Sequence, residues 1–525
     1  MVFFGKGTPM RGRVLNWAIT GTSDMIEYFT LQERMPTHIP AASCQGFLLL
    51  GYDQGVMSGL IGAQNQFAQE FHNPDPKLQG IITSIYDIGC AAGCLFCFFF
   101  GEHFGRKNVI LAGGSVMIIG TILLGSSTTL AQLLVGRIVT GIGNGFNSST
   151  IPMYQSELCR PENRGVLLSM QGTVTIVGLC IAYWLDYGLS FASGSVQWRL
   201  PISFQAFFAI CLVLQTIPLP ETPRYLIEQN RVREATSVLA RLMGPDTPDD
   251  DEEVVFQRRQ IESSLEIESA GGPFRFAELL EGGKVQNFRR LCLCCAVNVM
   301  QQFTGANMIN YYAPVVYANT MGLSRNLSLI LGGCTSLTYL AASFIPLWTV
   351  ERFGRRVLLM VSAGGLCFCF SMASIMLSIG TRHTAYAATA FVFIFQIFLG
   401  IGWLPIPWFY PSEVTTTRIR SKGQALGGFI NWMCVFTVVQ ITPIAINSIN
   451  VSLFLSRIHS SPPFIRRVIR FSLPMPIYQG LTRLCKKIVA HIHHLRHILL
   501  SLDSHRVHVL PRDEPATARG YRPLI

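Results

Sequence analysis

The sequence predicts an all-α integral membrane protein, from its composition and from the length of its apolar runs. Half of the 525 residues are hydrophobic, 14% are charged and the mean hydropathy is +0.37, whereas soluble proteins carry about 25% charged residues. Apolar runs of roughly 20 residues, the length that crosses a bilayer, recur along the chain. Because backbone polar groups in lipid must be satisfied within the segment, each run is expected to be a helix.

About eleven of these runs are candidate membrane spans. They begin near Gly46, Gly80, Asn108, Leu130, Val166, Leu200, Leu291, Ser328, Val357, Ala385 and Ala425. The first, GFLLLGYDQGVMSGLIG, has 17 residues and is at the short limit for a span. LNWAIT at residues 15–20 reads as the start of this helix, so residues 21–45 are interpreted as an aberrant insert within an N-terminal segment, 1–45. A charged re-entrant insert is the alternative.

Lys and Arg concentrate in alternate connections between the runs, which predicts that these connections are cytoplasmic. The long polar stretch 220–289 belongs to this set. It separates an expected N-terminal helix bundle, 46–219, from a C-terminal bundle, 290–450.

Two charged motifs occur in both halves. EHFGRK at 102–107 corresponds to ERFGRR at 351–356, and SELCRPENRG at 156–165 corresponds to SEVTTTRIRSKG at 412–423. The shared order and spacing indicate duplicated six-helix halves. Their acids and bases lie at cytoplasmic helix ends, and we expect a charge network that holds this side closed, with solvated loop charges as the alternative. The predicted network comprises Glu102, Arg106, Glu157, Arg164, Glu351, Arg355, Glu413 and Arg420.

The segment 451–525 differs from the rest of the chain. It carries 12 Lys and Arg against 3 Asp and Glu, and it has no apolar run of 18 residues. The twelfth helix expected from two six-helix halves is therefore missing. We interpret the segment as a basic, frame-shifted tail; an interfacial helix on an anionic membrane is the alternative. Because the tail supplies most of the net charge of +11, that charge does not indicate a nucleic-acid partner.

No catalytic constellation, phosphate-binding loop or zinc-type spacing of ligands occurs in the sequence. Cysteines such as Cys292, Cys294 and Cys295 lie within apolar runs and are interpreted as buried thiols. The sequence therefore predicts neither an enzyme, nor a cofactor, nor a metal site.

Five further motifs span the chain from about Gly46 to Asn450. They are GYDQGVMSG at 51–59, GRIVTGIGNG at 136–145, PETPRYL at 220–226, QQFTGANMINYY at 301–312 and PIPWFYPSE at 405–413. Together with the two glycine–basic turns, this set resembles the sugar porters of the major facilitator superfamily, in their fungal-type branch. The resemblance implies a major facilitator fold of two six-helix bundles, a central sugar site and alternating access.

Amide side chains both donate and accept hydrogen bonds, which suits the recognition of sugar hydroxyls. The resemblance implies that such contacts come from Gln301, Gln302, Asn307 and Asn431, with Trp408 as an aromatic platform.

A further candidate, Gln171, lies one residue before the position where the family has a glutamine, which is Gly172 here. A displacement of one residue rotates a helical side chain by about 100°. Gln171 is therefore kept as a candidate that departs from the family pattern.

An acid within a membrane span is a functional hypothesis whose partner should be named. Asp53 lies within the first span, and Arg137 begins another long apolar run of the same half. We predict that ionised Asp53 pairs with Arg137 and that protonation frees both. The resemblance implies that Asp53 is the proton site of a proton-coupled porter, whereas a permanent ion pair in a uniporter is the alternative.

The sequence thus predicts a multi-pass protein, expected in the plasma membrane, that transports a sugar with a proton. A monosaccharide such as a hexose is the expected substrate. The alternatives are a facilitative uniporter for a sugar, polyol or quinate, a sugar sensor that does not transport, and a non-functional product of a truncated gene.

Overall fold

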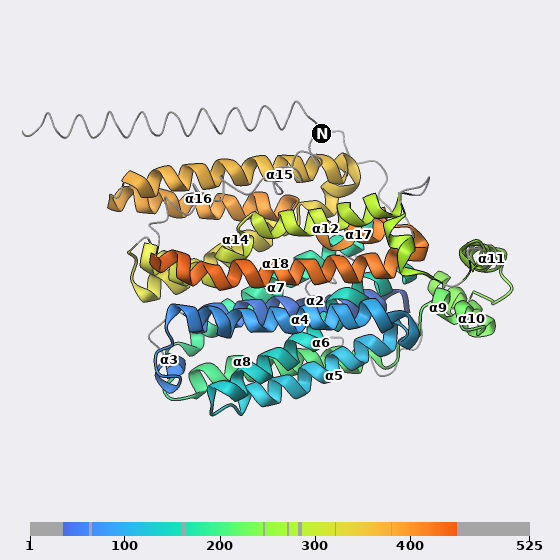
Figure 1. Cartoon of the computed structure of the whole chain (residues 1–525), viewed down its shortest axis with the longest axis horizontal. Coiled ribbons are helices and arrows are strands. Elements are labelled where there is room, and N and C mark those ends of the chain that lie inside the picture. The colour runs from blue at the N-terminus through green and yellow to red at the C-terminus, as the bar shows by residue number, and fades with distance from the viewer. Residues whose placement is uncertain are drawn as a thin grey trace, which may run out of the picture. The chain divides into compact units, whose positions relative to one another are not determined.

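A computed structural model describes residues 35–61, 66–159, 164–244, 247–269, 272, 274–281, 286–320, 322–379 and 381–448. Every regular element in these ranges is helical, which confirms the all-α prediction. Figure 1 shows the long helices of this part of the chain lying alongside one another. The predictions made for LNWAIT, for residues 21–34 and for the tail 451–525 lie outside the described residues.

Six long helices form the N-terminal half. They are α2 (Met35–Leu60), α4 (Pro76–Phe104), α5 (Arg106–Gly125), α6 (Leu130–Leu158), α7 (Arg164–Leu189) and α8 (Val196–Thr216), with the short α3 (Gln66–Glu70) after the first. Local sequence explains their starts: Asp75 accepts a hydrogen bond from the Leu78 N–H at 3.0 Å ahead of Pro76, and Thr129 accepts from the Gln132 N–H at 3.3 Å. Both are side-chain N-caps.

The first helix begins at Met35, eleven residues before the predicted start at Gly46, and is 26 residues long. The prediction of a span limited to 17 residues is therefore wrong. The physical reason is that no Asp, Glu, Lys or Arg occurs between Arg34 and Asp53. Residues before Gly46 take part in packing, since Ile39 is buried and Gln45 Nε2 donates to the Phe208 carbonyl at 3.2 Å.

The C-terminal half contains helices that are broken more often. They are α12 (Asn287–Phe303), α13 (Ala306–Val315) with the π-helical η4 (Val316–Thr320), α14 (Arg325–Ser343), α15 (Pro346–Ile379), α16 (Arg382–Ile401), α17 (Ile406–Val414) and, after η5 (Thr417–Ile419), α18 (Arg420–Ser448). Gly305 has φ 83° and separates α12 from α13. Pro405 is the N-cap residue of α17.

The polar stretch between the halves is also helical. It forms α9 (Pro223–Glu228), α10 (Val232–Met243), α11 (Glu252–Ser269) and the 3₁₀ segment η3 (Phe276–Leu280). Buried Val238 and Leu239 give α10 an apolar side that packs against its neighbours.

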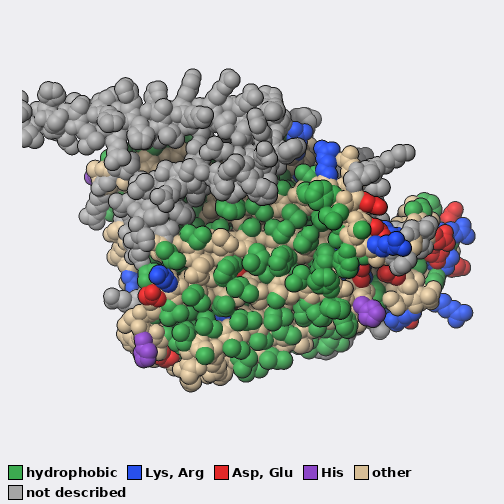
Figure 2. Space-filling view, viewed as in Figure 1, with side chains coloured by type: hydrophobic (Ala, Val, Ile, Leu, Met, Phe, Trp, Pro, Cys, Tyr) green, Lys and Arg blue, Asp and Glu red, His purple; other side chains and the backbone are tan. Residues whose placement is uncertain are grey.

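Helices occupy all eleven predicted runs. Of the described helices, seven are long and apolar enough to cross a membrane by length and composition alone. These candidate spans are Pro76–Phe104, Arg106–Gly125, Gly165–Leu189, Val196–Thr216, Pro346–Leu377, His383–Val414 and Arg420–Ile444. In Figure 2, hydrophobic side chains cover the visible side of the long helices, while the charged side chains gather toward the helix ends. Such an apolar belt fits a lipid environment.

The two halves meet along α4 with α18 and along α7 with α14. Hydrogen bonds cross between them at several depths: Ser84 Oγ donates to Gln440 Oε1 at 2.8 Å, and Trp432 Nε1 donates to Ser148 Oγ at 3.2 Å. These contacts place side chains of both halves around the candidate sites described next.

Candidate functional site

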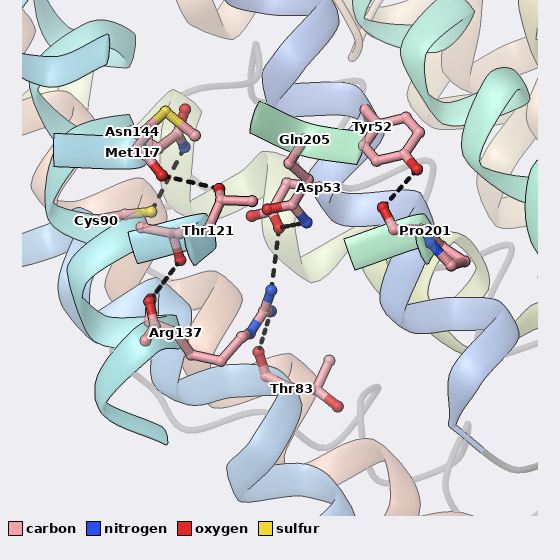
Figure 3. Close-up of polar contacts among 12 residues, drawn as sticks. Tyr52, Asp53, Thr83, Cys90, Met117, Thr121, Arg137, Asn144, Pro201 and Gln205 are labelled. Carbon is pink, nitrogen blue, oxygen red and sulfur yellow. Dashed lines mark hydrogen bonds and ion pairs between the residues drawn. The ribbon is translucent and has the colours of Figure 1, made fainter. Parts of the chain in front are cut away.

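The structure brings Asp53 and Arg137 together inside the N-terminal half. Arg137 Nη1 donates to Asp53 Oδ1 at 3.1 Å, and the two side chains are 1% and 0% exposed. Arg137 Nη2 donates to the Thr83 carbonyl at 3.1 Å, and Gln205 Nε2 donates to Asp53 Oδ1 at 2.7 Å. Figure 3 shows the side chains of Asp53, Arg137 and Gln205 converging, with the backbone carbonyl of Thr83 facing the Arg137 guanidinium. The four residues belong to α2, α6, α8 and α4.

The ion pair between Asp53 and Arg137 is covered on one side by an aromatic ring, and two of its polar atoms make no hydrogen bond to the described residues. The Arg137 guanidinium lies 4.7 Å from the centre of the Tyr86 ring, a cation–π contact. Asp53 Oδ2 and Arg137 Nε have no hydrogen-bond partner among the described residues. Removing one partner of a buried ion pair costs about 3–5 kcal/mol. The charge on Asp53 is therefore strongly tied to the position of Arg137.

The predicted amides form a second buried cluster in the C-terminal half. Asn431 Nδ2 donates to Gln301 Oε1 at 2.8 Å, and Gln302 Nε2 donates to Asn431 Oδ1 at 3.2 Å. Asn307 Nδ2 donates to Gln302 Oε1. A residue that the sequence reasoning missed, Asn298, also belongs here, because its Oδ1 accepts from Asn431 Nδ2 at 3.0 Å. All five side chains are buried.

Local structure explains why these amides converge. Asn298 lies three and four residues before Gln301 and Gln302, so the three share one face of α12. The left-handed conformation of Gly305 ends that helix, and Asn307 follows in the first turn of α13. The spacing of Asn298 was therefore a usable signal. It could have been found by placing QQFTGAN on a helix together with the preceding turn.

Trp408 lies beside the amide-bearing helix. Its ring centre is 6.0 Å from Phe47 of α2 and 6.1 Å from Trp432 of α18, which follows Asn431 in the chain. Trp432 is fully buried and was not singled out from the sequence. Three aromatic rings from both halves thus lie in a row, and Trp432 at one end of the row is next to Asn431 in the chain.

Gln171 is buried, but its side chain points to another partner. Its Nε2 donates to the side-chain oxygen of Gln155 on α6, within the N-terminal half. A Cβ on Gly172 would lie 3.4 Å from Leu404, which precedes α17. The position that the family pattern assigns to a glutamine thus faces the C-terminal half, while Gln171 is turned toward α6, as the one-residue displacement predicts.

The predicted charge network divides into separate groups. Within the N-terminal half, Arg106 Nη2 contacts Glu157 Oε1 at 3.3 Å. Within the C-terminal half, Arg355 Nη2 contacts Glu351 at 3.1 Å and Glu413 at 2.8 Å.

A link between the halves joins Glu102, a member of the predicted network, to two residues that were not singled out from the sequence. Lys422 Nζ contacts Glu102 Oε2 at 2.9 Å, and Ser421 Oγ donates to Glu102 Oε1 at 2.7 Å. The side chain of Arg164 lies outside the described residues, and Arg420 begins α18 next to Ser421. The gating role of the network remains a prediction.

Two acids of the polar connection anchor the bundles to it. Glu221 accepts the backbone N–H groups of Arg106 and Lys107 at 3.1 Å each, where α5 begins, and burial raises the pKa of its carboxyl group. Glu278 accepts two bonds from the Arg418 guanidinium at 2.6 and 2.8 Å, and these bonds lower the pKa of Glu278.

Comparison with known proteins identifies the family. The model described as "Sugar (and other) transporter" matches residues 38–458, so the matched region begins within α2, ahead of Gly46, and ends after Asn450. The MFS-type transporter oryC of Aspergillus oryzae is 39% identical over 421 residues, covering 78% of each chain. The sugar transporter STL1 of Saccharomyces cerevisiae is 37% identical over 447 residues, covering 83% of this chain and 76% of its own.

Solved structures agree on the fold. The proton:xylose symporter XylE bound to 6-bromo-6-deoxy-D-glucose superposes with a TM-score of 0.65 at 21% identity, covering 81% of this chain and 95% of its own. A double tryptophan mutant of XylE superposes with a TM-score of 0.67 at 23% identity, covering 79% and 90%. The chain is therefore a multi-pass membrane transporter, not an enzyme, and it belongs to the sugar transporter family of the major facilitator superfamily.

Proposed function

We propose that this transporter moves a monosaccharide, such as a hexose, together with a proton, by alternating access. The observation that carries proton coupling is the buried ion pair between Asp53 and Arg137. A carboxylate in this place is stabilised as an anion by the Arg137 guanidinium and the Gln205 amide. Protonation of Asp53 removes the charge that Arg137 opposes, and the buried guanidinium then has to find another partner.

This exchange links proton binding to helix movement. The four groups of the pair and its neighbours come from α2, α4, α6 and α8, which are all helices of one half. Breaking the contact between Arg137 and Asp53 removes the ion pair between α6 and α2, whereas the contact with Thr83 still ties α6 to α4. Loss of about 3–5 kcal/mol of pairing is enough to change the relative population of two arrangements by more than a hundredfold.

The amide cluster supports a sugar as substrate. In the described structure, Gln301, Gln302 and Asn431 satisfy one another. A bound sugar can replace these bonds with its own hydroxyls, because each amide both donates and accepts. Trp408, half-buried beside them, offers a ring face to the apolar side of a sugar. A low-affinity glucose transporter of Kluyveromyces lactis is 29% identical over 427 residues, and XylE, which has the same fold, is named a proton:xylose symporter.

The test is uptake of a panel of labelled hexoses, pentoses and polyols by transport-null cells at several external pH values. The wild type should accumulate a monosaccharide, and an external pH electrode should record proton uptake with it. Asp53→Asn should abolish accumulation and proton uptake while leaving sugar exchange at equal pH. Asp186→Asn provides the matched control, since Asp186 is a buried acid of the same half on α7.

The outcomes separate the alternatives. Uptake without proton movement, unchanged by Asp53→Asn, contradicts symport and leaves a facilitative uniporter. Saturable binding without uptake indicates a sensor, and a lack of both indicates a non-functional product. A fluorescent fusion should outline the cell surface, because we propose that the protein resides in the plasma membrane.

A further inference from the structure

Helix α4 carries a second acid that neither the ion pair nor the sugar site uses. Asp87 is fully buried, with an exposed fraction of 0%. Both of its carboxylate oxygens lack a hydrogen-bond partner among the residues that the structure describes. An ionised carboxylate without a partner is costly to bury, so this group must either hold a proton or gain a partner in another state.

The fold places Asp87 on the side of α4 that faces Arg137. Thr83, whose carbonyl accepts from Arg137 Nη2 at 3.1 Å, lies one helical turn before Asp87. Cys90, nearly one turn after Asp87, accepts from Asn144 Nδ2 of α6 at 3.5 Å. Asp87 therefore lies between two residues of α4 that contact α6.

The backbones of α4 and α6 are unusually close at this level. A Cβ on Gly89 would be 2.4 Å from the Ile138 carbonyl oxygen, and one on Gly141 would be 2.2 Å from the Tyr86 carbonyl oxygen. This approach confines the Asp87 side chain to the same buried layer as Arg137.

One cation serves two acids in this layer. The charged groups that act on Asp87 are Arg137 of α6 and Asp53 of α2. The other titratable groups near it are Cys90 on its own helix and Tyr311 and Tyr312 of α13.

The other two helices packed on α4, α5 and α18, add no charge at this depth. In α5 the charged side chains belong to Arg106 and Lys107 at its first turn. In α18 the charged side chains belong to Arg420 and Lys422 at its first turn, and Lys422 contacts Glu102. Glu102 is fifteen residues beyond Asp87 along α4, which is about 22 Å at 1.5 Å per residue. Two ionised acids sharing one guanidinium would leave an uncompensated negative charge, so the site favours one carboxylate and one carboxylic acid.

We propose that Asp87 is a second proton-binding residue of this transporter and the alternative partner of Arg137. Asp87 carries a proton while Asp53 is ionised and paired with Arg137. When Asp53 takes up a proton, its bond to Arg137 breaks, the guanidinium turns to Asp87, and Asp87 releases its proton. Transfer of the Asp53 proton to Asp87 then restores the first pair, so each cycle takes up one proton and releases one.

The depth of the two acids gives this exchange a direction. Asp53 is seven residues from the end of α2 at Leu60, roughly 10 Å, whereas Asp87 is eleven residues from the start of α4 at Pro76, roughly 17 Å. The Lys- and Arg-rich connections are predicted to be cytoplasmic, and both of these helix ends lie on the opposite side. We therefore predict that both ends are external. A proton that enters at Asp53 and leaves from Asp87 therefore moves inward.

The inference rests on the proposed proton symport, and the test uses the full chain in liposomes with labelled D-glucose, or with the panel sugar that the wild type accumulates. Asp87→Asn imitates the protonated acid permanently. It should keep sugar counterflow at equal pH but lose pH-driven accumulation and sugar-dependent proton uptake. Asp186→Asn, the matched buried acid on α7, should keep all three.

A second measurement does not depend on transport. Infrared spectra of the Asp186→Asn protein should contain a protonated-carboxyl band at neutral pH. When Asp87→Glu is introduced into this variant, the band should shift to the frequency of a protonated glutamic acid. This measurement decides the proposal if Asp87→Asn fails to fold. A band that stays unchanged in Asp87→Glu contradicts the proposal.

Proton symport and the role of Asp87 can be refuted separately. If the wild type moves sugar without protons, symport fails and the partner exchange fails with it. If the wild type is coupled and Asp87→Asn remains equally coupled, symport stands and only the role of Asp87 is overturned.

Discussion

A double-mutant cycle on Asp53 and Asp87, with the free energy of unfolding as its readout, tests whether both acids can pair with Arg137. Asp53→Asn removes the present partner of Arg137, whose Nη1 lies 3.1 Å from Asp53 Oδ1. If Asp87 becomes the partner of Arg137, the free energy of unfolding of this variant falls by much less than the roughly 3–5 kcal/mol expected for a buried charge without a partner. Asp87→Asn alone should be nearly neutral, because asparagine has the shape of the protonated acid.

The double variant Asp53→Asn/Asp87→Asn leaves Arg137 with the Thr83 carbonyl and the Tyr86 ring. The free energy of unfolding of this double variant should fall by about 3–5 kcal/mol. This decrease should exceed the sum of the decreases in the two single variants by about 1–3 kcal/mol, the range for residues that share a partner. Adding Arg137→Met should recover most of the loss, since the unpaired charge is then gone.

Unfolding of the purified full chain in mixed micelles, followed by tryptophan fluorescence against denaturant, measures these differences. The Asp186→Asn variant combined with Asp53→Asn serves as the control pair and should be additive. Additive losses for Asp53 and Asp87 would show that Arg137 does not exchange between them, and the reasoning from charge balance would be refuted.

Three further predictions concern other parts of the molecule. Asn298→Ala should raise the KM of sugar counterflow about tenfold, because a lost hydrogen bond in a buried amide cluster costs roughly 1–3 kcal/mol; an unchanged KM would exclude it from the site. The lowered pKa of Glu278 means that its bonds to Arg418 contribute stability above the ordinary glutamate pKa and lose it as pH falls through the lowered value. Glu278→Gln should therefore be slightly less stable than the wild type at pH 7 in thermal unfolding, and the difference should shrink as the pH falls below the ordinary glutamate pKa; a difference that does not shrink in acid contradicts the prediction. Gly51→Ala should sharply reduce folded yield, since its Cβ would be 1.7 Å from a carbonyl oxygen of α7, whereas Gly188→Ala, with nothing within 4 Å, should not; equal yields by size-exclusion chromatography would contradict this.

Sequence reasoning located the helices well because membrane spans follow a strong length and composition rule. It placed the first start wrongly because a count of apolar residues stops at polar ones, whereas Ser43 and Gln45 are accommodated inside the bundle. The Gln45 amide donates to the Phe208 carbonyl, and the small Ser43 hydroxyl is buried without a hydrogen-bond partner among the described residues. The missing length of the span was therefore present before Gly46 and did not have to come from LNWAIT.

Some residues of the candidate sites are indicated by the sequence, and others are recognised only from the packing of the helices. Asp53 and Arg137 could be named because each is a charge within an apolar run, and charges in lipid demand partners. Asp87 carried the same signal, as an acid within the apolar run that begins near Gly80, and was missed. The role of Gln205 could not be derived from the sequence, because it arises from which helices lie together. Gln205 is 152 residues from Asp53 in the chain, and the 2.7 Å contact exists only once α8 packs on α2.

The proton pair and the amide cluster lie in different halves, and aromatic side chains join them. Trp432 follows Asn431 on α18, and its ring centre is 6.1 Å from the ring of Tyr86. Tyr86 in turn lies against the Arg137 guanidinium, at 4.7 Å. Trp432 also contacts Trp408, the ring proposed to face the sugar, at 6.1 Å. Two rings therefore separate a sugar-facing tryptophan from the cation that the two acids share, so the proposed coupling of sugar and proton requires side-chain contacts already present across the interface of the halves.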